Sequence, residues 1–308
     1  MLNTAHQATV RQFILATRPR TYPIAIMSLG MGQSLAYRVL GGFGADNWVL
    51  CGLIIYTALS LQILSNLAND LGDGIRGTDH DRHRDSPTRL VGSGAVSADR
   101  FWVWVFGWLI QTMMAGSVLI WLSPLSAYQI VLFFGLGGVS ILGALGYTMG
   151  KKPYGYHALG EFAVLIFFGY VAVIGGYYLQ TGRADIVQNL PIATGVGLLS
   201  ACVLYVNNLR DTDTDPVSGK MTLAVVLDRY KIVGYMTLLF LAVVCYIYHA
   251  TIFGDRVWVL ALCLPLLIKH THAVITHRHN PARLGKELGV IVGLVIVMNV
   301  VMIGLVGV

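Results

Sequence analysis

Two short segments of the chain share an unusual combination of amide and carboxylate side chains. The first segment contains Asn66, Asn69, Asp70 and Asp73, and the second contains Asn207, Asn208, Asp211 and Asp215. Clustered carboxylates repel one another unless a cation lies among them. Mg²⁺ usually takes one or two carboxylates and completes its shell with water and phosphate oxygens. Two such clusters that face each other would therefore suit a diphosphate bridged by Mg²⁺.

Both segments are predicted to end a helix. On a helix, positions 66, 70 and 73 share one face, as do 207 and 211, with 215 one turn further on. Each segment can then direct several oxygen atoms at one point. The two segments are four predicted helices apart, which indicates a parallel internal repeat of four-helix units.

Basic residues that could hold the same diphosphate lie in the predicted loops at these helix ends. The candidates for a cationic clamp are Arg76, Arg89 and Lys220, and Lys151 belongs to a Tyr147-x-x-x-Lys151 motif between the two segments. Preorganised cations stabilise the charge that develops on a leaving diphosphate. The alternative is that these aspartates and basic residues are ordinary solvated charges beside a membrane. The presence of two matching segments favours a site.

One further carboxylate, Glu161, lies at the start of a predicted helix, directly after Gly160. It could orient the hydroxyl group of a substrate or accept a proton. The competing interpretation is that a Glu at this position simply stabilises the N-terminus of the helix. The sequence leaves both open.

The composition identifies the elements that must position these residues. Hydrophobic residues make up 56% of the 308 residues and charged residues only 12%, and the mean hydropathy is +0.67. A soluble domain needs about twice this charged fraction, so we expect an all-α polytopic membrane protein. The net charge of +6 then reflects membrane topology and attraction to anionic lipid headgroups, and no nucleic-acid partner is expected. The four cysteines lie singly in apolar runs, without the pairing of a zinc or redox site.

Nine uncharged runs are candidates for membrane helices. They cover residues 21–37, 48–69, 101–122, 128–150, 162–182, 186–208, 232–254, 257–268 and 288–308. The run 257–268 is short enough to be re-entrant, unless Arg256 and Lys269 extend toward the interfaces from its ends. No polar stretch is large enough to fold separately, so we expect a single domain over residues 1–308.

The distribution of basic residues favours nine spanning helices. If all nine runs span and the N-terminus is cytoplasmic, only Arg38, Arg183 and Arg256 lie outside, and the other 18 of the 21 basic residues lie inside, as the positive-inside rule requires. A re-entrant eighth run would move four basic residues outward. The C-terminus is then expected on the periplasmic side.

The flanking segments support the same topology. Residues 1–20 are expected to form an interfacial helix before the membrane, and the lack of a transit peptide favours a bacterial inner membrane. His270, His272, His277 and His279 are expected in the last cytoplasmic loop, as part of a basic interfacial segment rather than a metal site.

The motifs resemble those of a known family. Asn69-Asp70-Leu71-Gly72-Asp73, the segment from Asn207 to Asp215 with the following Gly219-Lys220-Met221-Thr222, and Tyr147-x-x-x-Lys151 are similar to the UbiA superfamily of intramembrane prenyltransferases. The similarity runs from Arg18-Pro19 to the last helix. It implies nine helices around a central cavity, Asp-rich cytoplasmic loops after helices 2 and 6, Mg²⁺, and an isoprenoid diphosphate whose tail lies toward the lipid. We expect Tyr147 and Lys151 of the Tyr-x-x-x-Lys motif to take part in catalysis, and we add Glu161 as a catalytic candidate from its position at a helix start.

Within the superfamily, the chain resembles the menaquinone branch. The similar stretches are Leu61 to Asp70, Lys152-Pro153-Tyr154-Gly155-Tyr156 and Asn207 to Asp211. This implies that a polyprenyl group is transferred to a ring carbon of 1,4-dihydroxy-2-naphthoate with loss of CO₂ and pyrophosphate, giving a demethylmenaquinone-type product. The alternative acceptor is another aromatic acid, such as 4-hydroxybenzoate or homogentisate.

The first motif departs from the usual pattern of the superfamily. The last Asp normally follows four residues beyond the middle one, but this chain has Gly77 there, and its next carboxylates are Asp79 and Asp81. The menaquinone branch resembles this longer spacing. We take Asp79 as the ligand and keep Asp81 as the alternative.

Two other classes of protein use acidic residues at membrane helices. Asp70-Leu71-Gly72-Asp73-Gly74 superficially resembles the CDP-alcohol phosphotransferases, but that family continues with Ala-Arg and needs no second Asp motif, whereas this chain continues with Gly77-Thr78. A cation-coupled transporter tends to place acidic ligands near the bilayer midplane in inverted repeats. Here they are expected at cytoplasmic helix ends in a parallel repeat, which favours an enzyme.

Overall fold

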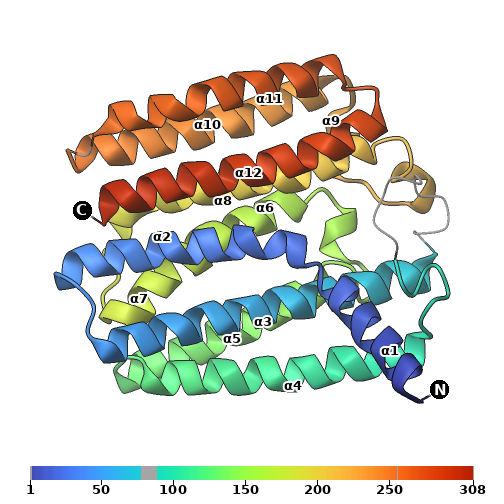
Figure 1. Cartoon of the computed structure of the whole chain (residues 1–308), viewed down its shortest axis with the longest axis horizontal. Helices are drawn as coiled ribbons and strands as arrows, with labels where there is room; N and C mark the ends of the chain where they lie inside the picture. The colour runs from blue at the N-terminus through green and yellow to red at the C-terminus, as the bar shows by residue number, and fades with distance from the viewer. Residues whose placement is uncertain (1, 78–88, 255, 308) are drawn as a thin grey trace.

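The protein is a bundle of long helices that run side by side (Figure 1). The computed structural model describes residues 2–77, 89–254 and 256–307, with side chains described from residue 10 onward. The long helices are α1 (Leu2–Thr17), α2 (Tyr22–Leu40), α3 (Ala45–Arg76), α4 (Ala98–Leu122), α5 (Ala127–Gly146), α8 (Ile186–Arg210), α10 (Lys231–Ile252), α11 (Leu264–Thr276) and α12 (Pro281–Val306). The shorter ones are η1 (Pro19–Thr21), η2 (Tyr154–Tyr156), α6 (Gly160–Val164), η3 (Leu165–Gly175), α7 (Gly176–Thr181), η4 (Pro216–Ser218), α9 (Leu223–Leu227), η5 (Asp228–Tyr230) and η6 (Val257–Cys263). The predicted all-helical class is confirmed for these residues.

Eight helical stretches in the described part of the chain are long and apolar enough to cross a membrane. They are residues 45–76, 98–122, 127–146, 160–181, 186–210, 223–252, 257–276 and 281–306. The short run predicted at residues 257–268 extends to Thr276 in the structure. The additional part of the helix contains Lys269 and two histidines.

The first predicted run forms helix α2, but this helix is too polar to count among the eight. Its Gln33 is buried and donates from Nε2 to the carbonyl of Gly176 at 3.0 Å. Polar side chains are tolerated in this helix because the protein itself supplies their partners. The number of nine spans therefore stays a prediction, although a helix occupies each of the nine predicted runs.

Helices α6, η3 and α7 form one continuous stretch whose middle part, η3, is a π-helix. Gly169 in this part lies against α8, where a Cβ would meet the carbonyl oxygen of Ala193 at 2.5 Å and the Cα of Gly197 at 3.1 Å. The two backbones touch because neither glycine has a side chain. This contact holds the stretch that begins at Gly160, and therefore carries Glu161 in its first turn, against the helix that ends at Arg210.

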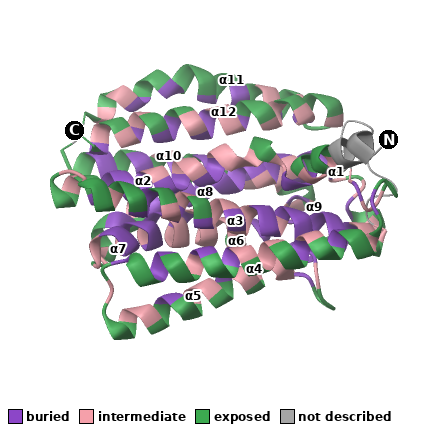
Figure 2. Ribbon diagram, turned by 60° about the horizontal axis from the view of Figure 1, so that its bottom comes forward, coloured by how far each residue is buried: buried purple, intermediate pink, exposed green. Residues whose placement is uncertain are grey.

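Helix α8 occupies the centre of the bundle. In the most apolar part of this helix, 78% of the residues are buried, against 39% or less in the same part of the other seven candidate spans. Figure 2 shows this helix buried among its neighbours, whereas α4 and α5 are largely exposed. A helix enclosed on all sides can hold polar groups away from lipid and water, which is what a buried site requires.

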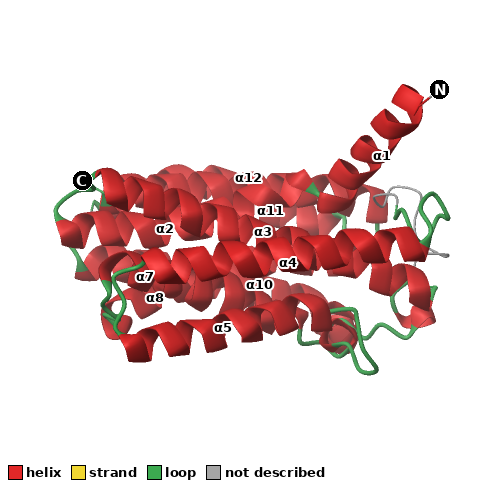
Figure 3. Cartoon of the chain, turned by 90° about the horizontal axis from the view of Figure 1, so that it is seen from below, coloured by secondary structure: helices red, strands yellow, loops and turns green. Residues whose placement is uncertain are grey.

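The two Asn/Asp segments lie at the same end of the bundle, where α3 ends at Arg76 and α8 ends at Arg210 (Figure 1). We call this the aspartate end. The N-terminus lies here and the C-terminus at the opposite end. Helix α1 leaves the bundle obliquely (Figure 3), with the Phe13 ring against Trp104 at 5.4 Å.

One predicted helix is longer than expected, and one prediction about a loop needs correction. The apolar run 48–69 predicted a helix that ends near residue 69, but α3 continues to Arg76, so Asp70 and Asp73 belong to its last turns. His270 was expected in a loop, but it lies in α11, fully buried, and contacts the Tyr235 hydroxyl and a Glu287 carboxylate oxygen at 2.6 Å each. No local pattern indicated that these partners on α10 and α12 would contact the histidine.

Candidate active site

The first cluster lies on the last turns of α3, where Asp70 and Asp73 are each 2% exposed. Asp70 accepts hydrogen bonds from the backbone N–H groups of Leu90 and Val91, at 3.2 and 3.1 Å. Gly74 allows this approach, since a Cβ there would meet the Val91 side chain at 2.6 Å. The segment after α3 therefore folds back onto the helix that carries the carboxylate.

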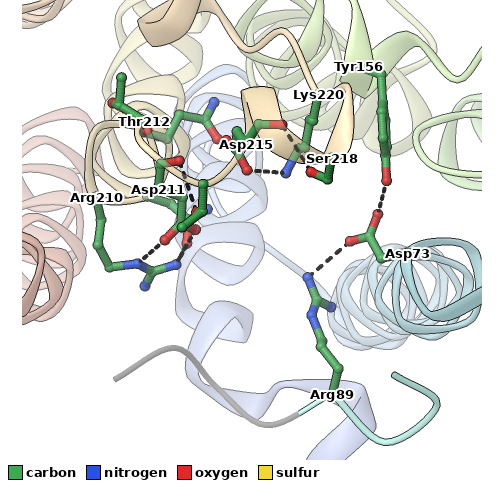
Figure 4. Close-up of polar contacts among 12 residues, drawn as sticks. Asp73, Arg89, Tyr156, Arg210, Asp211, Thr212, Asp215, Ser218 and Lys220 are labelled. Atoms are coloured by element: carbon green, nitrogen blue, oxygen red, sulfur yellow. Dashed lines mark hydrogen bonds and ion pairs between the residues drawn. The ribbon is translucent and has the colours of Figure 1, made fainter. Parts of the chain in front are cut away.

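Asp73 is held by two side chains from different parts of the chain. Its Oδ1 accepts a hydrogen bond from the Tyr156 hydroxyl at 2.8 Å, and its Oδ2 lies 3.3 Å from Nη2 of Arg89 (Figure 4). Arg89 is 10% exposed, so this ion pair is largely removed from water. These two contacts offset the cost of burying the carboxylate, which would be high without such partners.

The two asparagines of the first segment connect α3 to its neighbours. Asn66 donates to the carbonyl of Thr17 at 2.9 Å, and Asn69 accepts from the Thr148 hydroxyl at 3.2 Å. Thr148 packs directly on the helix at Gly72, where a Cβ would meet its Oγ1 at 2.7 Å. Both asparagines thus anchor the end of α3, and the structure does not bring their amides to the carboxylates of the second segment.

The second cluster begins at the end of α8. Asp211 is 1% exposed, and its two carboxylate oxygens accept from Nε and Nη2 of Arg210 at 2.7 and 2.6 Å. The same Nη2 donates to Oδ1 of Asn207 at 2.9 Å. This two-point contact between a guanidinium and a carboxylate is the strongest type of side-chain ion pair.

Asp215 closes the second cluster through the short turn that follows. Its carboxylate Oδ1 lies 3.7 Å from Nζ of Lys220, and its backbone carbonyl accepts from the Lys220 N–H at 2.9 Å. Asp215 and Lys220 are 3% and 4% exposed. The turn therefore fixes a buried carboxylate and a buried ammonium group side by side.

A backbone bridge joins the two clusters. The N–H of Met221 donates to the carbonyl of Tyr156 at 3.1 Å, and the N–H of Ala158 donates to the carbonyl of Met221 at 2.8 Å. Tyr156 contacts Asp73, and Met221 follows Lys220, so the bridge connects the partner of one cluster to the partner of the other (Figure 4). The segment between α5 and α6 is therefore the part of the chain that sets the distance between the clusters.

Tyr147 lies among the carboxylates. Burial, followed by the negative charges of Glu161, Asp73 and Asp215, raises the pKa of its phenol above the ordinary value, so the hydroxyl stays protonated at neutral pH. The ring contacts Tyr154, with the ring centroids 5.4 Å apart. Tyr147 is thus a neutral aromatic group within electrostatic range of both clusters and of Glu161.

Glu161 lies in the first turn of α6 and is 3% exposed. Its Oε1 accepts a hydrogen bond from Nδ2 of Asn208 on α8 at 2.7 Å. A Glu that served only the helix N-terminus would lie near water, so its burial against Asn208 favours a role in the site.

The four buried aspartates suit Mg²⁺ only together with a substrate. Across residues 2–77, 89–254 and 256–307, no group of three or more His, Cys, Asp or Glu side chains is close enough to hold a metal ion by itself. Each cluster instead supplies two buried carboxylates. This donor set fits Mg²⁺, which takes few carboxylates and completes its shell with water and phosphate oxygens.

Other predicted site residues are exposed or lie outside the described part of the chain. Lys151 is exposed on the turn after α5. Arg76 is exposed as well, and its guanidinium donates to the carbonyls of Thr148 and Gly150 and lies over the Tyr156 ring. Asp79, and its alternative Asp81, lie outside the described residues. Two partners of the carboxylates, Arg210 and Tyr156, were not predicted, although both lie within the motifs from which the site was predicted.

Comparisons with known proteins agree on a family. The UbiA prenyltransferase family matches residues 31–300. The chain is 41% identical over 257 residues to a 1,4-dihydroxy-2-naphthoate octaprenyltransferase of Haemophilus influenzae, with 82% of each chain covered. It is 34% identical to the Escherichia coli protein of the same name, with 84% of this chain and 83% of that protein covered.

A solved structure shows the same fold. It is that of a UbiA homolog from Archaeoglobus fulgidus bound to DMAPP and Mg²⁺, with a TM-score of 0.57 and 16% sequence identity. The alignment covers 95% of this chain and 99% of that one. At this level of identity the similarity concerns the arrangement of the helices and extends to no particular residue.

Proposed function

Because this chain belongs to the UbiA prenyltransferase family, we propose that it transfers a polyprenyl group from an isoprenoid diphosphate to 1,4-dihydroxy-2-naphthoate, in a reaction that depends on Mg²⁺. The names of the relatives in Haemophilus influenzae and Escherichia coli support this acceptor. The homolog bound to DMAPP and Mg²⁺ supports the donor and the metal.

One observation carries the proposal. Four buried aspartates from two segments far apart in the sequence lie at one end of the bundle, each with a hydrogen-bonding or cationic partner, and a backbone bridge links them. Among the described residues, no group of three or more His, Cys, Asp or Glu side chains could hold a metal by itself. Phosphate oxygens are the natural complement to the carboxylates.

The residues of the two clusters would bind the diphosphate. Asp70, Asp73, Asp211 and Asp215 would hold Mg²⁺, with Arg89 and Lys220 available as cations for the phosphate oxygens. Bound Mg²⁺ would supply positive charge that stabilises the pyrophosphate as it leaves. Arg76, Lys151, Asp79, Asn66, Asn69 and Asn207 stay proposed contributors. Their roles would be to support the clusters or to contact the diphosphate.

The reaction replaces one bond of the allylic carbon by another. The C–O bond to the diphosphate breaks, a ring carbon of the acceptor forms a C–C bond, and the carboxyl group leaves as CO₂, which gives the hydroquinone form of a demethylmenaquinone-type product. A neutral aromatic ring near the allylic carbon stabilises its developing positive charge, and Tyr147 is suited to this role because its phenol stays protonated between the clusters and Glu161.

The membrane setting follows the same reasoning. We propose a multi-pass protein of the bacterial inner membrane with nine spans, its aspartate end in the cytoplasm and its C-terminus in the periplasm. The bias of basic residues toward the aspartate end supports this orientation, since among the described Lys and Arg residues only Arg38, Arg183 and Arg256 lie at the opposite turns.

The test is pyrophosphate release by the purified protein with Mg²⁺ and a long-chain all-trans polyprenyl diphosphate. We expect release with 1,4-dihydroxy-2-naphthoate, none with 4-hydroxybenzoate, and loss of release when the metal is chelated. Release with the benzoate alone would refute the acceptor and keep the enzyme class. Release with neither acceptor would contradict the proposed function.

A further inference from the structure

The buried Glu161 and Asn208 pair contains two polar atoms that the diphosphate chemistry does not use. A Glu161 carboxylate can only accept hydrogen bonds, so Asn208 donates to its Oε1 from Nδ2. The Oδ1 atom of Asn208 is then left open, which means that it can accept a hydrogen bond from another group. Oε2 of Glu161 and Oδ1 of Asn208 are both buried and have no hydrogen-bond partner among the described residues. Buried polar atoms without a partner are rare in folded proteins, so these two indicate a ligand.

The chemistry of the two open atoms restricts the ligand. Both are hydrogen-bond acceptors, and one belongs to a carboxylate. A diphosphate offers only acceptors and negative charge, so it would be repelled at this position. A hydroxyl group is a suitable partner, because it can donate to either oxygen.

The pair lies beside the diphosphate site and not within it. A Cβ at Gly160, the residue before Glu161, would be 3.4 Å from the hydroxyl of Tyr147. Tyr147 is also within electrostatic range of Asp73 and Asp215. The Tyr147 phenol is therefore close to Glu161 and within electrostatic range of a carboxylate of each cluster, so the pair and the clusters can serve one reaction site.

The surroundings also suit an acceptor that carries a carboxylate. Lys220 lies within electrostatic range of Glu161 and can offset the charge that such an acceptor would bring. Thr222, two residues further on, is 2% exposed, and its hydroxyl has no partner among the described residues. A hydroxyl can donate to a carboxylate, which the open oxygens of the pair cannot do.

On the basis of the proposed function, we propose that Glu161 and Asn208 form the acceptor-binding pair, in which the open oxygens accept hydrogen bonds from a ring hydroxyl of the hydroxylated aromatic acid. A hydroxyl that donates to a carboxylate gains phenolate character, which makes the ring carbons better nucleophiles. The proton shared with Glu161 returns to the ring oxygen when CO₂ leaves, so Glu161 ends the reaction in its starting state. Asn208 thereby serves the acceptor, in place of its predicted role at the metal.

The test compares binding of the acceptor with binding of the donor in the full-length protein. Affinity for 1,4-dihydroxy-2-naphthoate is measured directly, without donor or Mg²⁺, in wild-type protein and in the variants Glu161→Gln and Asn208→Leu. Loss of a hydrogen bond to a buried charged group weakens binding by about 10- to 100-fold. We expect a loss of this size in acceptor affinity and in acceptor KM, with the KM for polyprenyl diphosphate unchanged.

Two controls separate recognition from folding. Asn189→Leu makes the same substitution at a buried asparagine in the first turn of the same helix, and it should leave acceptor affinity unchanged. Naphthoates with either hydroxyl methylated should bind wild-type protein more weakly than the parent acid, and this difference should vanish in Glu161→Gln.

The outcomes distinguish the inference from the proposed function. Variants that bind the naphthoate as wild-type protein does, or that lose affinity for donor and acceptor alike, would overturn the acceptor-binding pair and leave the proposed reaction standing. Wild-type protein that releases no pyrophosphate with the naphthoate, but does so with another aromatic acid, would overturn the proposed acceptor alone. The same affinity comparison with that acid would then decide the role of the pair.

Discussion

The two aspartate clusters look alike in the sequence but are held in different ways. Asp70 and Asp73 on α3 are bound by the backbone at Leu90 and Val91, by Arg89 and by Tyr156, which are 16 to 83 residues away. In the second cluster, Asp211 is bound by the adjacent Arg210 and Asp215 by the nearby Lys220. The first cluster therefore depends on the tertiary fold, whereas the second is assembled by one local stretch of chain.

This difference shows that two segments with the same motif can be held by different kinds of partner. If one diphosphate spans both clusters, the segment between α5 and α6 controls their alignment, because Tyr156 touches Asp73 and its backbone bonds Met221. The second cluster would then act as a rigid half of the site and the first as the adjustable half.

Removing one carboxylate from either cluster should have the largest effect. Asp73→Ala and Asp211→Ala are each expected to lower kcat/KM by at least about a thousandfold, the upper end for loss of one charge-stabilising group. Pyrophosphate release with saturating Mg²⁺ measures this. Asp46→Ala, at the exposed opposite end of the same helix as Asp73, is the control and should keep wild-type activity. Near-normal rates of pyrophosphate release in both cluster variants would contradict the proposed two-cluster site.

Replacing the arginine partner of each cluster should lower the free energy of unfolding by different amounts. Arg210→Met leaves the Asp211 carboxylate buried without either of its guanidinium contacts, so we expect a loss of about 3–5 kcal/mol in unfolding free energy. Arg89→Met should cost less, because Asp73 keeps the Tyr156 hydroxyl. Thermal unfolding in detergent compares them, and a larger loss for Arg89→Met would reverse the assignment of the rigid half.

Weakening the link between the clusters should have a smaller effect. Tyr156→Phe removes one hydrogen bond from Asp73 and keeps the backbone bridge. An unsatisfied buried acceptor costs about 1–3 kcal/mol, so we expect a rise of roughly 5- to 150-fold in the KM for polyprenyl diphosphate. Tyr154→Phe is the matched control, since its hydroxyl donates to the carbonyl of Gly143 on α5 and contacts neither cluster. Equal effects of the two variants would count against the link.

The smallest effect is expected at Lys151. This side chain is exposed, while Lys220 is 4% exposed beside Asp215. An exposed charge contributes little because water and salt screen it. Lys151→Ala should therefore change the donor KM less than tenfold, and Lys220→Ala should change it more. The opposite order, measured at the same ionic strength, would show that the turn after α5 reaches the diphosphate.

The sequence was sufficient for the features that local patterns encode. Apolar runs predicted the helices, and the Asn and Asp patterns predicted two clusters at helix ends. Helical spacing was expected to relate Asp211 and Asp215, but α8 ends at Arg210 and both lie in the turn that follows. The sequence could not reveal that residues 89–91 fold back onto α3 or that Tyr156 reaches Asp73, because these contacts depend on tertiary packing. For the same reason it could not reveal the hydrogen bond between Asn208 and Glu161.

The most direct test of the account is whether the two clusters hold one diphosphate. Affinity for a non-hydrolysable polyprenyl thiodiphosphate with Mg²⁺ is measured in wild-type protein, Asp73→Ala, Asp211→Ala and the double variant. If both clusters hold the same ligand, the double variant should bind little worse than either single one, since residues that act as a unit are strongly non-additive. If the loss of binding free energy in the double variant equals the sum of the losses in the two single variants, the clusters act independently and do not hold one diphosphate together.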